Sequence, residues 1–328
     1  MSWDLLGHEW AANLLKQHIL HGDVRHAYLF TGPPGIGRRS LALEFARTIN
    51  CLQPPSTGEA CGQCRVCLQT TKLQQPDLSI VEAETEGGLI KVDQIRTLQR
   101  SLSLSPYEAK FRVALLLNFQ RANHNAQNAL LKTLEEAPKQ VILLLTADAP
   151  DNLLPTISSR CEILRLRPVS MDLLEKELGL RWNIPQEDAK LVAHLSNGRT
   201  GLALQMSQDS GLMEKRRVQL DELIRLLPLN IQDRFASVEP LAINRDQLRM
   251  TLQVWLSFCR DLLLSANSRQ AHITNLDQSL EIRTISSQLD QTQLVKLLNA
   301  VDHSLELLDL NANLKLLLDN LFLEIPQI

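Results

Sequence analysis

A glycine-rich stretch near the start of the chain, residues 32–39, has the spacing of a phosphate-binding loop. A working loop reads G-x-x-x-x-G-K-[ST]: backbone N–H groups surround the phosphates, the lysine reaches the β- and γ-phosphates, and the hydroxyl ligates Mg²⁺. Here an arginine stands at the lysine position and another at the hydroxyl position, and neither substitution preserves that chemistry. The backbone could still hold an anion weakly. We therefore predict a degenerate, non-functional loop formed by Gly32, Gly35, Gly37, Arg38 and Arg39.

The acidic residues that usually accompany such a loop do not stand at their expected place. In phosphate-transferring proteins of this kind, an acidic residue at a strand end holds Mg²⁺. The candidate strand, residues 113–117, ends instead with Leu117 and Asn118, and neither carries a carboxylate. An alternative alignment would place the acids at Glu82 and Glu84, after another strand. The missing carboxylates and the altered loop together predict that this chain does not hydrolyse nucleotide. They leave undecided whether it binds nucleotide.

Four cysteines follow the loop with the spacing C-x9-C-x2-C-x2-C, at Cys51, Cys61, Cys64 and Cys67. The two short intervals turn thiolates towards one centre, and the first cysteine can complete a tetrahedron from the end of the preceding helix. Zn²⁺ with four sulfur ligands has a closed shell and is structural rather than catalytic. We therefore expect structural zinc, with an iron–sulfur cluster or a fortuitous grouping as alternatives. Cys161 and Cys259 lack partners at ligand spacing and are interpreted as buried thiols.

Apolar runs and helical patterns indicate the elements that position these residues. Five short runs have the character of buried parallel strands, at residues 27–30, 78–81, 113–117, 141–145 and 163–166. The first run leads directly into the phosphate-binding loop. Amphipathic helical patterns lie between the runs, notably at residues 126–136. This alternation predicts a three-layer α/β domain built on a parallel sheet.

After Pro168 the pattern becomes helical. Helices are expected at residues 171–178, 185–195, 201–206, 218–227, 247–264, 291–308 and 314–321. One wide apolar stripe, interpreted as bundle core, consists of Leu294, Leu297, Leu298, Val301, Leu305 and Leu308. We therefore expect three domains: a nucleotide-binding-like domain at 1–168 with the cysteine module at 51–67, a small helical lid domain at 169–207, and an all-α domain at 208–328.

The composition of the 328 residues narrows the classes of function. The chain is 44% hydrophobic and 22% charged, which suits globular domains with proper cores. A formal net charge of −3 gives no global attraction to nucleic acid. The first residues lack the pattern of a signal peptide, and no run approaches the roughly 18–20 apolar residues of a membrane span. We expect a cytoplasmic protein, in which thiols stay reduced.

Several motifs, taken together, resemble one family. Gly-His-Glu at residues 7–9 precedes the loop, and Pro-Asp-Leu at residues 76–78 follows the cysteines. Two longer segments come next: Asn-Ala-Leu-Leu-Lys-Thr-Leu-Glu-Glu at 128–136 and Leu-Pro-Thr-Ile-Ser-Ser-Arg-Cys at 154–161. The series is similar to the clamp-loader branch of the AAA+ ATPases, which includes subunits of bacterial DNA polymerase III. The similarity extends over about the first 205 residues.

The resemblance implies a heteropentameric ring with gamma/tau and delta subunits, which opens the sliding clamp and places it on primer–template DNA. In this family the Ser-Arg-Cys arginine reaches the γ-phosphate of ATP bound by a neighbouring subunit. That role would fall to Arg160, with Ser159 and Cys161 in support. The family's second sensing arginine is replaced by Gly201, two residues from Arg199. Residues 208–328 would form the oligomerising collar.

We therefore expect a subunit of a DNA polymerase III holoenzyme that does not hydrolyse ATP itself. The complete holoenzyme would be a nucleotidyltransferase, and ATP would be bound only by the neighbouring subunits. One alternative is a gamma/tau-like clamp-loader ATPase with divergent nucleotide motifs. Another is a zinc-dependent DNA-binding protein, which the charge and the scarce aromatic residues of the cysteine module argue against. For Arg160, the alternative is an ordinary surface ion pair.

Overall fold

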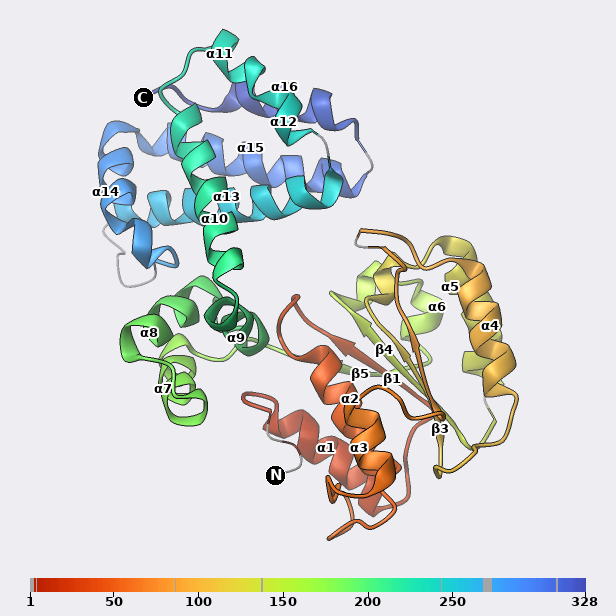
Figure 1. Ribbon diagram of the computed structural model, residues 1–328. Helices are drawn as coiled ribbons and strands as arrows, with labels where there is room; N and C mark the ends of the chain where they lie inside the picture. The colour runs from red at the N-terminus through yellow and green to blue at the C-terminus, as the bar shows by residue number, and fades with distance from the viewer. Residues whose placement is uncertain are drawn as a thin grey trace. The chain divides into compact units, whose positions relative to one another are not determined.

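The computed structural model describes residue 3 and residues 5–85, 87–136, 138–242, 244–267, 273–310 and 312–328. The chain divides into two compact units (Figure 1). The first consists of residues 1–169 and 199–202, and the second of residues 170–198 and 203–328. The phosphate-binding loop, the four cysteines and Arg160 all belong to the first unit.

The first unit is built on five parallel strands in the order β2-β3-β4-β1-β5. The strands are β1 (Ala27–Thr31), β2 (Leu78–Val81), β3 (Arg112–Leu116), β4 (Val141–Ala147) and β5 (Glu162–Arg165). The register places Ala27 opposite Leu143 in β4. Because all strands run in one direction, their carboxyl ends meet at the same edge of the sheet, where ligands of open α/β sheets usually bind.

Helices cover both faces of this sheet (Figure 1). On one face lie α1 (Glu9–Leu20) and α2 (Arg38–Ile49), with the short α3 (Arg65–Thr71) beside α2. On the other lie α4 (Val92–Leu102) and α5 (His124–Glu135), followed by the four-residue α6 (Pro155–Ser158). The unit is therefore a three-layer α/β sandwich.

Alternate strand residues supply the two cores of this sandwich. In β1, Ala27 and Leu29 pack on the side of α4 and α5, whereas Tyr28 and Phe30 pack on the side of α1 and α2. Strands β3 and β4 alternate in the same way. A strand buried on both faces needs a continuous apolar run, which is why these strands are visible in the sequence.

The described residues of the second unit form helices and connecting segments, with no strand among them. It contains α7 (Met171–Trp182), α8 (Gln186–Leu195), all but the start of α9 (Thr200–Gln208), α10 (Ser210–Leu226), α11 (Ile231–Ala236), α12 (Val238–Leu241), α13 (Arg245–Ala266), α14 (Ser279–Gln288), α15 (Gln291–Asp309) and α16 (Leu314–Glu324). Trp255 of α13 is buried at the centre, and its Nε1–H donates to Gln219 O at 2.7 Å. The predicted stripe on α15 belongs to the same core, which confirms its interpretation.

The fold class expected from the sequence is confirmed, with a parallel α/β sheet followed by a helical region. Strand β2 has the predicted bounds, whereas β4 extends two residues further, to Ala147. Helix α14 was not expected, and it buries only Ile282 and Ile285. The division into three domains stays a prediction. Among the described helices, none combines the length and apolar character that crossing a membrane requires.

Candidate functional site

The phosphate-binding loop connects β1 to α2 and keeps the backbone frame of its glycines. Gly32, Gly35 and Gly37 have φ of 145°, 79° and 109°, a region that residues with a Cβ atom rarely adopt. A Cβ atom on Gly32 would also lie 2.7 Å from Leu166 O, so a larger residue does not fit without a shift. The predicted loop is therefore present as a structural element.

Arg38, at the lysine position, lies in the first turn of α2 and is only 7% exposed. Its Nη1 donates to Asp148 Oδ1 at 2.7 Å, and its Nη2 donates to Asn118 Oδ1 at 3.2 Å. Asn118 follows β3 and Asp148 follows β4, so the guanidinium joins two strand ends next to the loop. Positive charge at a helix N-terminus is unfavourable, and the Asp148 carboxylate offsets it here. The arginine at the lysine position is thus paired with a carboxylate of its own chain.

The other altered positions differ in their burial. Arg39 and Ser40 are both exposed, whereas Arg38 is buried. Leu117 is buried, at 4% exposure, and its side chain is apolar. Asn118 has a left-handed backbone, and its N–H donates to Thr146 Oγ1 at 2.7 Å. Its amide oxygen meets the guanidinium where a carboxylate would be needed to bind Mg²⁺.

The start of α9 contacts the loop directly. The N–H of Leu202 donates to Gly35 O at 3.1 Å, and a Cβ atom on Gly201 would lie 2.7 Å from the same oxygen. An arginine therefore cannot replace Gly201 unless the loop moves. His8 also contacts the loop, with its Nε2 2.7 Å from Ile36 O. Both contacts fix the loop in its present conformation.

Arg199 precedes Gly201 by two residues and belongs to the first unit. Its side chain is partly buried, and burial lowers the pKa of its guanidinium. The structure brings Gly201, rather than Arg199, against Gly35 of the loop. A substitute role for Arg199 in sensing nucleotide stays a hypothesis.

Arg160 lies after α6 and before β5, and its side chain is 36% exposed. Its Nη1 donates to Thr156 O at 2.8 Å, and its Nη2 pairs with Glu135 Oε1 at 2.7 Å. Ser159 Oγ donates to the same carbonyl, Thr156 O, at 3.3 Å. Cys161 is only partly buried, contrary to the expected buried thiol, and packs against the core beneath α4 and α5. The geometry fits both interpretations of Arg160, a surface ion pair and an arginine that serves a neighbour.

Sequence analysis did not identify Asp148 or Glu135 as partners of the two arginines. Asp148 carries a recognisable signal, since an acidic residue directly after a buried parallel strand lies at the ligand-binding edge of the sheet. Glu135 lies in the segment 128–136 that supports the family resemblance, but its pairing with Arg160 needs the packing of α5 against α6. Neither pairing follows from spacing in the sequence.

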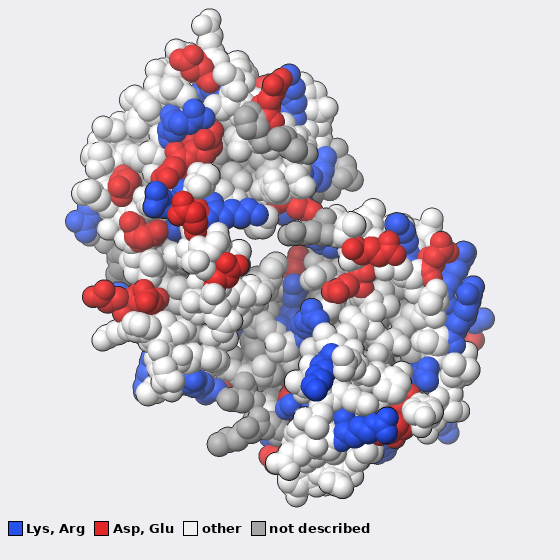
Figure 2. Space-filling model, viewed as in Figure 1, with Lys and Arg blue, Asp and Glu red and all other residues white. Residues whose placement is uncertain are grey.

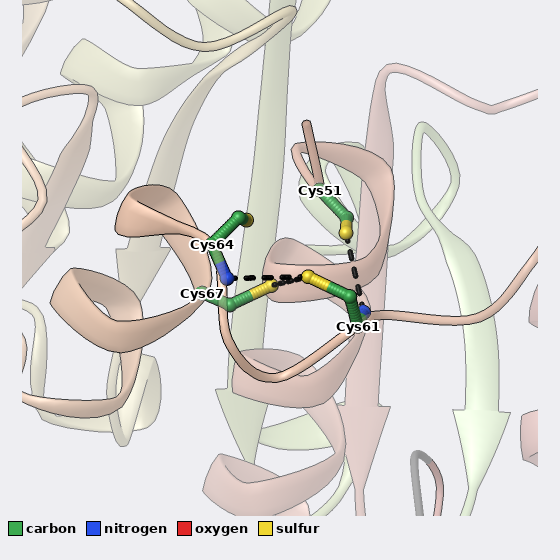
Figure 3. Close-up of side chains that lie close together, drawn as sticks. All are labelled: Cys51, Cys61, Cys64 and Cys67. Atoms are coloured by element: carbon green, nitrogen blue, oxygen red, sulfur yellow. Dashed lines mark hydrogen bonds between the residues drawn. The ribbon is translucent and has the colours of Figure 1, made fainter. Parts of the chain in front are cut away.

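The structure brings the four predicted cysteine ligands together (Figure 3). Their Sγ atoms all lie within 4.8 Å of one another, and those of Cys61 and Cys67 are 3.9 Å apart. A tetrahedral zinc with Zn–S bonds of about 2.3 Å separates its sulfurs by about 3.8 Å. Cys51 comes from the end of α2, whereas Cys64 and Cys67 come from the start of α3. The cluster fits a metal ion that joins these two helices.

Hydrogen bonds prepare this cluster for binding a cation. The N–H of Cys64 donates to Cys61 Sγ at 3.2 Å, and the N–H of Cys61 donates to Cys51 Sγ at 3.2 Å. Backbone donors at Cys64 and Gln63 lower the pKa of Cys61 to about 6, which favours the thiolate that binds metals. Burial raises the pKa of Cys51 and of Cys67, and a bound cation would offset that cost.

The two remaining cysteines lie outside this cluster. Burial raises the pKa of Cys161 and of Cys259 to about 12. Cys259 is fully buried in the core of the second unit, as predicted. Such thiols stay protonated and are poor nucleophiles and poor metal ligands. They therefore have structural roles.

Comparisons with known proteins agree with this architecture. The family model for "DNA polymerase III, delta subunit" matches residues 7–170. The delta′ subunit of DNA polymerase III from Pseudomonas aeruginosa is 32% identical over 248 residues, 74% of this chain and 72% of the relative. The delta′ subunit from Bacillus subtilis is 28% identical over 320 residues, 96% of this chain and 94% of the relative.

Among solved structures, a DNA polymerase III gamma subunit-related protein from Thermotoga maritima is similar over 97% of each chain, with 21% identity and a TM-score of 0.47. The family model spans half of the chain, and a delta′ relative exceeds 30% identity over most of it. These two matches are independent of the geometry described above. The chain therefore belongs to the family of DNA polymerase III delta subunits, and its relatives include delta′ subunits as well as tau/gamma subunits.

Proposed function

We propose that this chain is the delta′ subunit of a bacterial replicative clamp loader and hydrolyses no ATP itself. It supplies Arg160 to a neighbouring ATPase subunit in a ring with gamma/tau and delta subunits. The ring loads the sliding clamp onto primer–template DNA during replication, in the cytoplasm. The observation that carries the proposal is the pairing of the buried Arg38, at the end of the phosphate-binding loop, with Asp148 after β4.

The nucleotide side of the proposal follows from charge and space. A phosphate entering the loop would meet the Asp148 carboxylate, and the two anions would repel each other. To bind it, Arg38 would have to leave Asp148 and Asn118, which costs the hydrogen bonds of a largely buried cation. No carboxylate stands at residues 117–118 to hold Mg²⁺. These features disfavour a working ATPase site in this chain.

The trans role of Arg160 is supported by its surface position. The guanidinium is held by weak, partly exposed contacts, in contrast to the buried Arg38. Donors of the partly exposed guanidinium therefore remain accessible to a phosphate of a neighbouring subunit. An arginine supplied to a neighbour's γ-phosphate raises phosphoryl-transfer rates by roughly 10³–10⁵ in comparable systems. A subunit without chemistry of its own would thus still contribute to hydrolysis.

We assign the four-cysteine cluster to structural zinc. Its sulfur ligands, compact spacing and two-helix origin suit a closed tetrahedral site. An iron–sulfur cluster is the alternative that metal analysis separates, because iron and inorganic sulfide would then be found. The metal would hold the chain between α2 and α3 and take no part in nucleotide chemistry.

The charge distribution supports DNA contact through the assembly rather than through this chain alone. Lys and Arg side chains are interspersed with Asp and Glu on the face shown in Figure 2, and the net charge is −3. A protein that binds DNA by itself usually presents a strongly basic surface. We therefore propose that primer–template DNA and the clamp are bound by the complete ring.

The test is ATP hydrolysis by the complex reconstituted with wild-type or Arg160→Ala chain. At the site that Arg160 serves, we expect turnover to fall by about 10³-fold. We expect the ATP hydrolysis rate of the whole complex, measured with DNA and clamp present, to fall by at least the contribution of that site to the total rate. Arg167→Ala is the matched control, because Arg167 is also exposed and lies just beyond β5. If the complex with Arg160→Ala hydrolyses ATP at the wild-type rate, Arg160 does not act on the neighbouring subunit.

A second measurement separates the scaffold from a divergent ATPase. The isolated chain is titrated with labelled ATP and Mg²⁺, and phosphate release is followed in the same samples. We expect no turnover above the protein-free background. Micromolar binding accompanied by turnover would instead favour the gamma/tau-like ATPase.

A further inference from the structure

Glu135, the last residue of α5, makes the ion pair that holds the exposed end of Arg160. Its Oε1 lies 2.7 Å from Arg160 Nη2, while Arg160 Nη1 donates to Thr156 O at 2.8 Å. A guanidinium is planar and has five N–H donors. The two contacts involve its two terminal nitrogens, and the Nε–H takes part in neither. The orientation of the plane is therefore defined while donors remain for another acceptor.

The end of α5 that carries Glu135 is itself anchored to the sheet. The carbonyl of Leu134 accepts a hydrogen bond from His26 Nε2 at 2.9 Å, and His26 directly precedes β1. Leu134 is buried at 2% exposure. The backbone next to Glu135 therefore has little freedom to move. The carboxylate is placed by the core of the domain, although it is exposed.

The same helix also places the segment that leads to Arg160. Gln127 of α5 accepts a hydrogen bond from the N–H of Leu154, immediately before α6, at 2.9 Å. Leu153 and Ile157 pack into the core that α5 covers. One helix thus sets both the backbone before Arg160 and the carboxylate that holds its side chain. Both charged groups are therefore placed relative to α5.

Such a pair has little effect on stability, because both side chains are partly exposed, at 36% and 51%. Its main physical consequence is the loss of rotamer freedom of a long arginine side chain before a partner arrives. Positioning a catalytic group in advance is a large source of rate enhancement. Because the pair contributes little to stability, Glu135 is dispensable for folding, and its effect on ATP hydrolysis can be tested without unfolding the chain.

We propose that Glu135 is a positioning residue for Arg160. It holds the guanidinium in the orientation from which its remaining N–H donors reach the terminal phosphate of a nucleotide bound by the neighbouring subunit. This inference rests on the proposed function, since it requires Arg160 to act in trans. It adds a second residue of this chain, at the end of α5, to the neighbour's ATPase site.

The test compares Glu135→Gln with Glu136→Gln in the reconstituted complex. Glu136 is the adjacent exposed acid and provides the matched control. We expect Glu135→Gln to lower turnover at the served site by about tenfold, so that kcat of the complex moves most of the way to that of Arg160→Ala. KM for ATP stays unchanged, because the interaction acts in the transition state. Glu136→Gln keeps wild-type values.

Two further measurements separate positioning from folding. The thermal midpoint of the isolated Glu135→Gln chain is expected within about 2 °C of wild type. In an Arg160→Ala background, Glu135→Gln should cause no additional loss of kcat, because the two residues act as one unit. An additional loss would mean that Glu135 acts by another route and would overturn the proposal.

The remaining outcomes distinguish this inference from the function on which it rests. A wild-type or raised kcat for Glu135→Gln, with a lowered kcat for Arg160→Ala, overturns the positioning role and leaves the trans role intact. A wild-type kcat for Arg160→Ala overturns the proposed function itself. A changed KM with an unchanged kcat would place Glu135 in ground-state binding and also contradict the proposal.

Discussion

Two arginines of the first unit show how differently one residue type is used. Arg38 is buried, at 7% exposure, and bound to Asp148 and Asn118. Arg160 is partly exposed and held by Glu135 and one backbone carbonyl. The charge of arginine is permanent, so a buried guanidinium must keep its hydrogen-bond acceptors, of which Asp148 is the anionic one for Arg38. The first arginine is therefore enclosed by its own chain, and the second keeps part of its guanidinium accessible to another molecule.

This contrast leads to a prediction about Asp148. Asp148→Ala leaves the guanidinium of Arg38 without its anionic partner at the N-terminus of α2. We expect the free energy of unfolding of the first unit to fall by about 1–3 kcal/mol, a reduced value because Asp148 is itself 38% exposed. Urea denaturation measures the change, with the exposed Asp151→Ala as control. Equal midpoints for both variants would mean that the pair contributes nothing to the loop.

The residue identities at the loop were predictable, whereas their partners were not. Arg38 and Arg39 follow from the loop spacing, and Leu117 and Asn118 follow from the end of one apolar run. The pairing of Arg38 with Asp148, 110 positions apart, depends on β1 and β4 being neighbours in the sheet. Strand order is a long-range property that local patterns do not encode. Spacing alone therefore indicated which chemistry was missing, but not what had replaced it.

At the scale of elements, the cysteine module is the part whose stability depends most on a ligand. Residues 51–64 contain no helix or strand between α2 and α3. Its contacts with the rest of the unit include a hydrogen bond from Trp3 Nε1 to Gly58 O at 2.8 Å and an ion pair between Lys16 and Glu59 at 3.7 Å. The ion pair is partly exposed and adds little. A metal would add order to this segment.

We therefore predict that Cys64→Ser removes the bound zinc and destabilises the first unit. Loss of a structural metal is among the largest single-site effects, here about 3 kcal/mol or more. Metal content by mass spectrometry and thermal unfolding with and without a chelator measure both consequences. Gln63→Ala, an exposed non-ligand change in the same module, is the control. Iron in the wild-type protein, or zinc retained by Cys64→Ser, would contradict the zinc assignment.

Elements with strong apolar patterns were predicted well, and weakly patterned ones were not. The runs that form β1, β3 and β4 are buried on both faces, because helices cover both sides of the sheet. The end of β4 was missed at Thr146, a polar residue that is buried because its hydroxyl accepts the N–H of Asn118. Helix α14 escaped because only Ile282 and Ile285 face the core. A polar residue that is buried because its side chain makes a hydrogen bond does not appear in the sequence as part of an apolar run.

For the whole molecule, the separation of the hydrophobic cores has the clearest consequence. The two cores of the sandwich contain only residues of the first unit, and the helical core contains only residues of the second. Domains with separate cores often unfold in separate transitions. A change inside one core should therefore leave the other transition in place.

Arg234 offers the sharpest test of this independence. It is 2% exposed, and its guanidinium donates to the carbonyls of Leu226, Leu227, Phe322, Ile325 and Pro326, where α10 and α16 end. Arg234→Ala leaves several buried helix-end carbonyls unpaired, so we expect the midpoint of the helical unit to fall by about 5 °C or more. The chelator-sensitive transition should stay in place, and the exposed Arg217→Ala should move neither. If Arg234→Ala shifts both transitions together in calorimetry, the two units are one cooperative body, and the effects of the cysteine and loop variants must be assigned to the whole chain.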